Sequence, residues 1–273
     1  MKNEKEEERE LNVKSYTKLL NFYKIVLEPS FTDIRKNSET LLYDCFTNIF
    51  RYNNIVSNNG ISFEKISLDT QHIFASICKT SDLDVLTEIK NKDGIKIEED
   101  TDFILESYTY FYIDFKNFGL SVIKTQKIPS ADGYIKNLIN NNSVINLSIE
   151  PFKKSDKEIK DMIINSFSMS FYDNSDNFVE LKNIDKNDCE ISSFTFSAKL
   201  KKVKKNFVSD LLSKYRENKD IKKISVSTDT EEIDLIKNIF TKQVSIQLTK
   251  DYKKDFSRIE ETLNKELIKI INT

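Results

Sequence analysis

One histidine, three cysteines and many carboxylates are the side chains from which this chain could build a reactive site. His72 is the only histidine in 273 residues, so a Ser-His-Asp triad or a histidine-based metal site would depend on it alone. Cys45, Cys78 and Cys189 lie far apart and show no Cys-x-x-Cys spacing. We therefore predict that His72 is a hydrogen-bonded or surface histidine, and that Cys45, on the apolar face of an expected helix, is a buried structural thiol.

Carboxylates could also hold Mg²⁺ in a nuclease, which needs two acidic residues and a Glu-x-Lys pattern on a neighbouring strand. Glu180-Leu181-Lys182 follows Asp173 and Asp176 across an expected hairpin. The same pattern occurs at 88–90 and 158–160, where helices are expected, and a chain with 32% charged residues produces it by chance. A metal-dependent nuclease is therefore kept as an alternative, with no metal ligand and no catalytic residue assigned.

Glycine is too scarce and too scattered to build a phosphate-binding loop. The four glycines stand alone at positions 60, 94, 119 and 133. Such loops need clustered glycines, because only glycine lets the backbone approach a phosphate so closely. We predict a protein that holds no cofactor and is not an enzyme.

The strongest functional signal is a basic segment that runs from Lys199 to Lys223. It holds ten basic and three acidic residues, a net charge of +7, in a chain of overall charge −2, so the remainder carries −9. Seven of its lysines are expected to converge on one edge of a sheet and to contact DNA phosphates without reading bases. They are Lys199, Lys201, Lys202, Lys204, Lys205, Lys222 and Lys223. The alternative is a solvated charged face that is balanced by acidic neighbours.

Residues 1–142 are predicted to form an N-terminal α+β domain that begins with an acidic tail at 1–14. Apolar spacing predicts strands at 19–27 and 73–78, helices at 38–51 and 82–92, and a loop at 53–60. A hairpin at 108–123 is the most distinct β signal, and its apolar run indicates strands buried on both faces. Pro129 and Ser130 then begin a helix that continues to Ile139.

Residues 143–273 are predicted to form a second α+β domain. Expected in order are a strand at 147–151, a helix at 153–164, a hairpin at 167–181 and a strand at 193–201 whose Phe194, Phe196, Ala198 and Leu200 face the core. A helix at 203–215, a strand near 224–226, a helix at 233–240 and a strand at 244–248 follow. The chain ends in an amphipathic helix whose stripe at 256, 259, 263, 267 and 270 could pack on the sheet or on a second copy.

These patterns together predict an α+β protein of two mixed α/β lobes, with strand–helix alternation in the C-terminal half and a terminal amphipathic helix. The element order resembles that of the RexA-type phage-exclusion proteins of temperate phages. The similar parts are the aromatic strand at 110–114, the ending Ser148-Ile149-Glu150-Pro151, the Lys-rich passage at 196–215 and the strand at 221–228. The acidic tail and the hairpin at 167–181 differ from the family.

The resemblance implies a cytoplasmic homodimer that binds duplex DNA nonspecifically and works with a membrane effector protein in phage defence. We therefore predict a non-enzymatic DNA-binding sensor. The widely spaced cysteines agree with a reducing, cytoplasmic location, and no run approaches the ~18–20 apolar residues that cross a bilayer. The second hypothesis is a protein-interaction module, such as an anti-defence inhibitor or an assembly subunit, because the rest of the chain is acidic and the C-terminal stripe could meet a partner.

Overall fold

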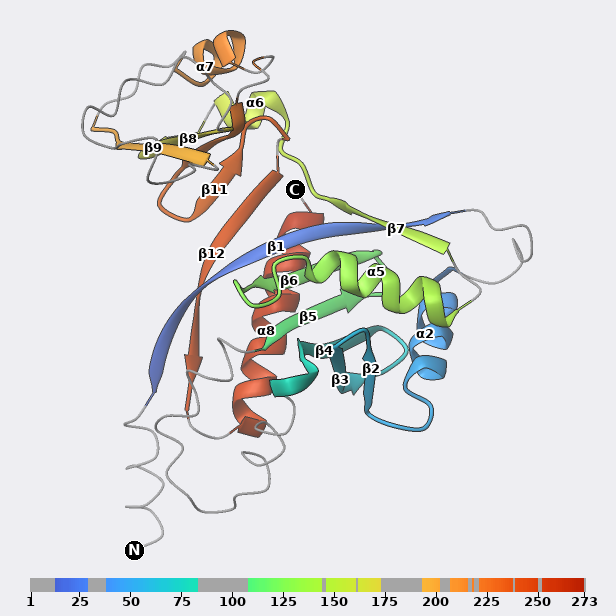
Figure 1. Cartoon of the computed structure of the whole chain (residues 1–273). Helices are drawn as coiled ribbons and strands as arrows, with labels where there is room; N and C mark the ends of the chain where they lie inside the picture. The colour runs from blue at the N-terminus through green and yellow to red at the C-terminus, as the bar shows by residue number, and fades with distance from the viewer. Residues whose placement is uncertain are drawn as a thin grey trace, which may run out of the picture. The chain divides into compact units, whose positions relative to one another are not determined.

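The computed structural model has the α+β class that the sequence predicts, with helices packed on antiparallel sheet (Figure 1). It describes residues 13–28, 38–82, 108–143, 146–160, 162–172, 193–201, 207–215, 218, 221–237, 239–249 and 252–272. The chain divides into two compact units, of which unit 1 is Met1–Pro151 with Gln243–Thr273 and unit 2 is Phe152–Lys242. The sequence places the boundary at 142/143 and gives the terminal helix to the second domain. In the structure that helix belongs to unit 1, because it packs on unit 1 strands.

Unit 1 is built on an antiparallel sheet with the strand order β2-β3-β4-β5-β6-β1-β12, and β7 also pairs with β1. Its strands are β1 (Lys14–Glu28), β2 (Ile55–Asn58), β3 (Ile61–Leu68), β4 (His72–Lys79), β5 (Thr109–Asp114), β6 (Gly119–Lys124), β7 (Asn146–Pro151) and the second part of β12 (Ile239–Leu248). Its helices are α2 (Ser38–Ile49), the short 3-10 turn η1 (Thr80–Asp82), α5 (Ala131–Asn142) and α8 (Tyr252–Ile271).

The two faces of this sheet are covered by different helices, as Figure 1 shows. Helices α2 and α5 cover one face, and their apolar residues join those of β3 to β6 in one core that includes Phe46, Phe111 and Ile135. Helix α8 covers the other face and lies against β5 and β6. The predicted hairpin at 108–123 is confirmed as β5 and β6, whose side chains are buried on both faces as expected.

The C-terminal stripe packs on the sheet of its own chain, which decides between the two arrangements left open by the sequence. Leu263 and Leu267 are fully buried, and the hydroxyl of Ser121 on β6 donates to the carbonyl oxygen of Leu263. Gly119 allows the close approach, since a Cβ there would lie 2.8 Å from the terminal methyl of Ile271. The stripe is therefore part of the core of unit 1.

The predicted loop at 53–60 is wrong, because it contains β2, which pairs with a further strand, β3, that the sequence analysis does not anticipate. The two strands are joined by Asn59 and Gly60, with φ of +50° and +77°. An Asn-Gly pair with positive φ at both residues makes the tight turn that suits the twist of a two-stranded hairpin. The Asn-Gly dipeptide therefore indicates a hairpin, although the polar residues around it suggest a loop.

Unit 2 is a smaller sheet with the strand order β9-β8-β10-β11-β12. Its elements are α6 (Asp156–Lys160), β8 (Ser166–Tyr172), β9 (Ser193–Lys199), α7 (Phe207–Tyr215), β10 (Ile221–Ser227), β11 (Glu231–Asp234) and the first residues of β12. All pairings among them are antiparallel. Phe207 of α7 contacts the ring of Phe167 on β8, so α7 covers the apolar side of this sheet.

Two predicted helices of unit 2 need correction. The helix expected at 233–240 is wrong: Glu231–Asp234 is a strand, and Asp234 accepts hydrogen bonds from the backbone N–H of Ile236 and Lys237. That side-chain oxygen turns the chain where the isoleucine spacing suggests helix. The helix expected at 153–164 is shorter, since α6 starts after a cap at Ser155 and ends at Lys160.

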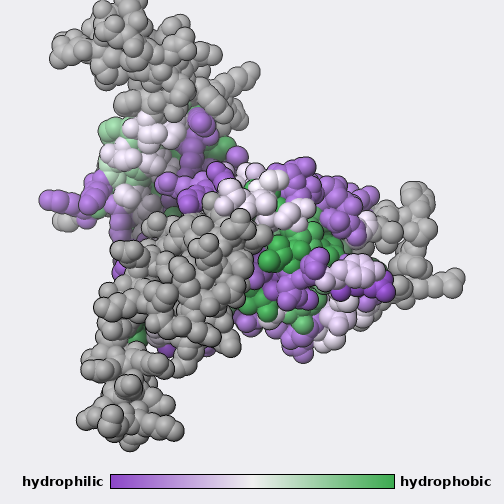
Figure 2. All heavy atoms as spheres, turned by 60° about the horizontal axis from the view of Figure 1, so that its bottom comes forward, coloured by the Kyte–Doolittle hydropathy of each residue, from purple (hydrophilic) through white to green (hydrophobic). Residues whose placement is uncertain are grey.

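The helix predicted at 82–92, beyond Asp82, and the start of the helix predicted at 203–215 lie outside the described residues, as do residues 178–181. The hairpin predicted at 167–181 is wrong, because β8 pairs with β10 on one side and with β9 on the other. No helix in the described ranges is both long and apolar enough to cross a membrane. On the face shown in Figure 2, hydrophilic residues surround a compact hydrophobic area. Large apolar side chains that are exposed among the described residues are few and separate in sequence: Val13, Tyr52, Ile163, Phe196 and Ile268.

Candidate functional site

The pairing of β8, β9 and β10 sorts their side chains into a polar face and an apolar face. Directly paired residues of neighbouring strands lie on the same side of a sheet, and successive residues alternate between sides. We call the polar side the hydroxyl face. It consists of Ser166, Ser168 and Ser170 on β8, Thr195, Ser197 and Lys199 on β9, and Lys223, Ser225 and Ser227 on β10.

The hydroxyl face is most open at β9. Thr195, Ser197 and Lys199 are exposed, the serines of β8 are half-buried, and Ser225 on β10 is only 4% exposed. Hydroxyls bond across the strands, with 2.9 Å between Ser170 Oγ and Thr195 Oγ1. A second such bond of 2.7 Å joins Ser168 and Ser225. The face is thus a hydrogen-bonded array of hydroxyls that opens to solvent along β9.

Two of the predicted lysines lie on the hydroxyl face, and one of these two forms an ion pair. Lys199 lies on the face, and Lys201 follows it; both are exposed, and neither forms an ion pair within the described part of the chain. Lys223 shares the face with Lys199 but bonds to Glu232 at 2.5 Å, so its charge is neutralised. Lys222 is exposed beside the irregularity in β10.

Lys202, Lys204 and Lys205 lie outside the described residues, so their convergence with the others stays a prediction. Lys199 pairs with Ser166 and Lys223 with Ser170, which puts these two lysines at opposite ends of the face. On the hydroxyl face, the exposed positive charge of the described residues therefore lies at the Lys199 end of β9. The alternative of a balanced charged face holds at the other end, where Glu232 sits beside Lys223.

The opposite face of these strands is apolar, with Met169, Ile224 and Val226 buried. Phe196 shares this face and lies 5.7 Å from the ring of Phe167. The prediction that Phe196 is a core residue is nevertheless wrong, because 48% of it is exposed. The alternation of apolar residues predicts the correct side of the sheet for Phe196. Its side chain is nevertheless exposed, because β8 is the only described strand beside β9 and shields Phe196 from one side only.

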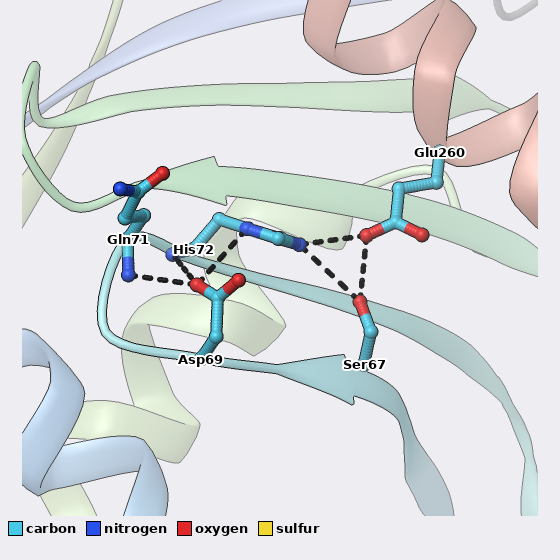
Figure 3. Close-up of polar contacts among 5 residues, drawn as sticks. All are labelled: Ser67, Asp69, Gln71, His72 and Glu260. Carbon is cyan, nitrogen blue, oxygen red and sulfur yellow. Dashed lines mark hydrogen bonds and ion pairs between the residues drawn. The ribbon is translucent and has the colours of Figure 1, made fainter.

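The second cluster of interest surrounds His72 on the α8 face of unit 1 (Figure 3). Nε2 of His72 lies 2.7 Å from Oε1 of Glu260 on α8, and Nδ1 lies 3.1 Å from Oδ1 of Asp69. The same Glu260 oxygen accepts a 2.6 Å hydrogen bond from Ser67. The imidazole also stacks on Tyr112 with centroids 4.9 Å apart. His72 is therefore hydrogen-bonded, as the sequence analysis predicts.

Charge around the imidazole favours its protonated form. The hydrogen bond to Glu260 raises the pKa of His72 above its ordinary 6.5; burial opposes this rise, and the nearby charges of Asp69, Glu260 and Asp114 add to it. Burial tends to raise the pKa of Glu260, but the hydrogen bonds from His72 and Ser67 outweigh it and leave that pKa lowered. Both shifts favour the form of the pair in which the imidazole is protonated and the carboxylate is charged.

Ser67, His72 and Asp69 have the order of contacts of a nucleophile triad, but Glu260 occupies the position that the serine would need. Ser67 Oγ lies 3.4 Å from Nε2 and donates its proton to Glu260 instead. Since Nε2 lies 2.7 Å from Glu260 and Ser67 donates to the same carboxylate, the imidazole is not placed to take the proton of Ser67 as a general base. The geometry fits a charge network that fastens α8 to the β3–β4 hairpin.

The Glu-x-Lys patterns supply no metal site in the described ranges. Glu158 caps α6: its carboxylate accepts from the backbone N–H and the hydroxyl of Ser155, and these bonds lower its pKa. The patterns at 88–90 and 180–182 lie outside the described residues. Within those residues no group of three His, Cys, Asp or Glu side chains could hold a metal ion.

The prediction for Cys45 is confirmed, because the thiol is buried in the core, and burial raises its pKa to about 11. Sequence reasoning missed Glu260 altogether, since it lies 188 positions from His72 and no local signal connects them. The serines of the hydroxyl face, in contrast, are predictable from the sequence. They alternate with apolar residues in 166–171 and in 193–198, the pattern of a strand with one polar side.

No protein-family model matches the chain, and no curated protein matches it.

Proposed function

We propose that this protein is a non-enzymatic, sequence-nonspecific duplex-DNA-binding protein that acts as a sensor in phage defence and contacts the phosphate backbone with the open end of the hydroxyl face. The observation that carries the proposal is the register of β8 and β9, which puts Lys199 in one row with exposed Thr195 and Ser197. Serine and threonine hydroxyls and lysine ammonium groups are common phosphate contacts, and they carry no sequence information.

Three features support phosphate binding over a merely solvated surface. The basic segment is positive in a chain that is otherwise negative. Lys199 and Lys201 are exposed and form no ion pair in the described part of unit 2. The predicted Lys202, Lys204 and Lys205 follow them directly in the sequence. Five lysines within seven positions would together attract phosphates strongly at low salt.

The proposed setting is the cytoplasm, where DNA and reduced thiols occur together and where the buried thiols of Cys45 and Cys78 fit. A homodimer and a membrane effector protein as partner follow from the resemblance to RexA-type proteins and form part of the proposal. No cofactor is proposed.

Binding of a fluorescent duplex and of its scrambled-sequence counterpart, followed by anisotropy at low salt, tests the proposal. The wild-type chain should bind both alike. Lys199→Glu/Lys201→Glu should weaken binding about tenfold or more, since each reversal removes a phosphate contact and adds repulsion. The matched control is Lys79→Glu/Lys116→Glu, an equal change of charge at exposed lysines of unit 1.

Either of two results would overturn the proposal: no binding by the wild-type chain at low salt, or equal loss in both double variants. The first would favour the protein-interaction module. Cleavage of a plasmid in the presence of Mg²⁺, abolished by Glu180→Ala, would instead favour the nuclease.

A further inference from the structure

Among the described residues, strand β9 shows none of the features that usually protect the edge of a sheet. Among the described strands it is the last in its sheet, with β8 on one side and no described strand on the other. Residues 193–198 contain no proline, no glycine and no charge, and the first lysine is Lys199 at the end of the strand. Exposed edges normally carry charges, proline or bulges, because their unpaired N–H and C=O groups recruit other strands.

The residues of β9 are also arranged almost symmetrically about Phe196. Thr195 and Ser197 flank it on the hydroxyl face, and residues 194 and 198 follow on the apolar face. If a second β9 strand pairs antiparallel with the first and is centred on Phe196, hydroxyl side chains therefore lie opposite hydroxyl side chains, and apolar side chains lie opposite apolar ones. Cross-strand pairs of this kind are the units that stabilise a sheet.

We propose that a second copy of this chain pairs antiparallel with β9, with the two-fold axis at Phe196. In that register Thr195 lies opposite Ser197 of the second copy, and all seven residues of the strand are paired. The two Phe196 rings meet on the axis and leave water, which accounts for an aromatic side chain that is 48% exposed in the single chain.

A second copy fits this edge better than an unrelated strand does, because a two-fold interface needs a surface that is complementary to itself. The charges agree with this arrangement. Lys199 would lie opposite residue 193 of the other chain, so the two Lys199 residues stand at opposite ends of the joined strands, roughly 20 Å apart. No like charges meet along the pairing, and the hydroxyl face continues from one chain into the next.

This inference deepens the proposed function and rests on its homodimer part alone, because that proposal includes a homodimer but assigns no surface to self-association. It does not require DNA binding, and its test uses the full chain without nucleic acid. A failure of the pairing leaves the lysine experiment above untouched, so the two outcomes are distinguishable.

Sedimentation velocity of the full chain over a concentration series is the first test. A single strand pair is a small interface, so we expect the wild-type chain to pass from monomer to dimer as concentration rises. Phe196→Lys should stay monomeric at every concentration, because the two lysines would lie opposite each other on the axis and their like charges would repel. Ile163→Lys, at an apolar residue of unit 2 that is 82% exposed, should dimerise like the wild type. A monomeric wild-type chain, or a Phe196→Lys variant that dimerises normally, would overturn the proposal.

Cysteine cross-linking tests the register itself and does not depend on how well Phe196→Lys folds. In a Cys189→Ser background, Phe196→Cys should form a disulfide-linked dimer under mild oxidation. Opposed residues of an antiparallel pair have Cα atoms about 4.5–5.5 Å apart, within the range of a disulfide. Ser197→Cys should not, since the two copies of that residue would lie about 8 Å apart, beyond a disulfide's reach. Equal cross-linking of both variants, or of neither, contradicts the pairing.

Discussion

Two sheet faces of this molecule carry polar side chains and use them in opposite ways. On the α8 face of unit 1, His72 lies between Asp69 and Glu260, and Ser67 donates to the same Glu260. On the hydroxyl face of unit 2, Thr195, Ser197 and Lys199 are exposed to solvent, and α7 packs on the opposite face.

The difference teaches where binding capacity can reside in a chain this rich in charge. Polar groups that are paired within the fold contribute to stability, and their hydrogen-bonding groups are already occupied. Polar groups that face solvent contribute little to stability and stay available for a ligand. Changes in the α8 face should therefore affect unfolding and leave the proposed DNA binding unchanged, while changes at the open end of the hydroxyl face should do the reverse.

The largest expected effect tests whether α8 belongs to the core of unit 1. Leu263→Ala removes a fully buried side chain and should lower the free energy of unfolding by about 2–5 kcal/mol in urea titrations. The control Ile268→Ala lies on the same helix at a residue that is 41% exposed and should change it by no more than about 0.5 kcal/mol. Equal effects of the two variants would mean that the stripe does not pack as described.

Removal of Glu260 should have the next largest effect, because it leaves both Ser67 and His72 without their shared acceptor. We expect Glu260→Ala to lower the free energy of unfolding by about 1–2 kcal/mol at neutral pH. Glu261→Ala, at the exposed neighbouring position, serves as control and should be close to neutral. If the two variants unfold alike, the histidine cluster contributes nothing to stability.

The same cluster predicts a pH dependence with a definite sign. Since the folded pKa of His72 is raised above 6.5, its stabilisation is fully present below pH 6.5 and is lost as pH rises through the raised value. The pKa of Glu260 is lowered, so that carboxylate stays charged from pH 5.5 to pH 9. The difference in unfolding free energy between the wild type and His72→Gln should therefore shrink as the pH is raised from 5.5 to 9. A difference that stays constant with pH, or grows, contradicts this account.

The smallest effect concerns two buried serines on the α8 face that differ in one hydrogen bond. Ser121 donates to the carbonyl oxygen of Leu263, whereas the Ser76 hydroxyl has no partner in the described structure. Ser121→Ala should cost about 1 kcal/mol and Ser76→Ala less than about 0.5 kcal/mol. Tyr110→Phe should be equally neutral or stabilising, because that buried hydroxyl is also unpartnered in the described structure. A substantial cost at Ser76 or Tyr110 would mean that these hydroxyls do bind a partner.

Much of the fold was predictable because its periodic segments are long. The hairpin at 108–123, the helix at 38–51 and the terminal helix each repeat their pattern over more than ten residues, and their existence follows from burial alone. The helix wrongly expected at 233–240 rests on three isoleucines spaced by three. In the structure this spacing spans two strands and a turn made by the Asp234 side chain, a local interaction that periodicity does not register.

The two clusters differ in how far a sequence can lead to them. Alternating serines and phenylalanines make the hydroxyl face readable strand by strand, but only the register places Lys199 and Lys223 at opposite ends of it. The histidine cluster joins Ser67 to Glu260 across 193 positions, and that contact exists only because α8 packs back onto β5 and β6. Long-range packing of this kind has no local signature.

The most direct test of the central claim is the salt dependence of DNA affinity, measured for the wild-type chain and for Lys199→Ala/Lys201→Ala. Each phosphate contact contributes about 0.9 to the slope of log affinity against log salt, so the account predicts a slope that is shallower by about 2 in the double variant. The variants Glu260→Ala and Lys79→Ala/Lys116→Ala should keep the wild-type slope. An unchanged slope after loss of Lys199 and Lys201 would contradict the assignment of DNA binding to the hydroxyl face.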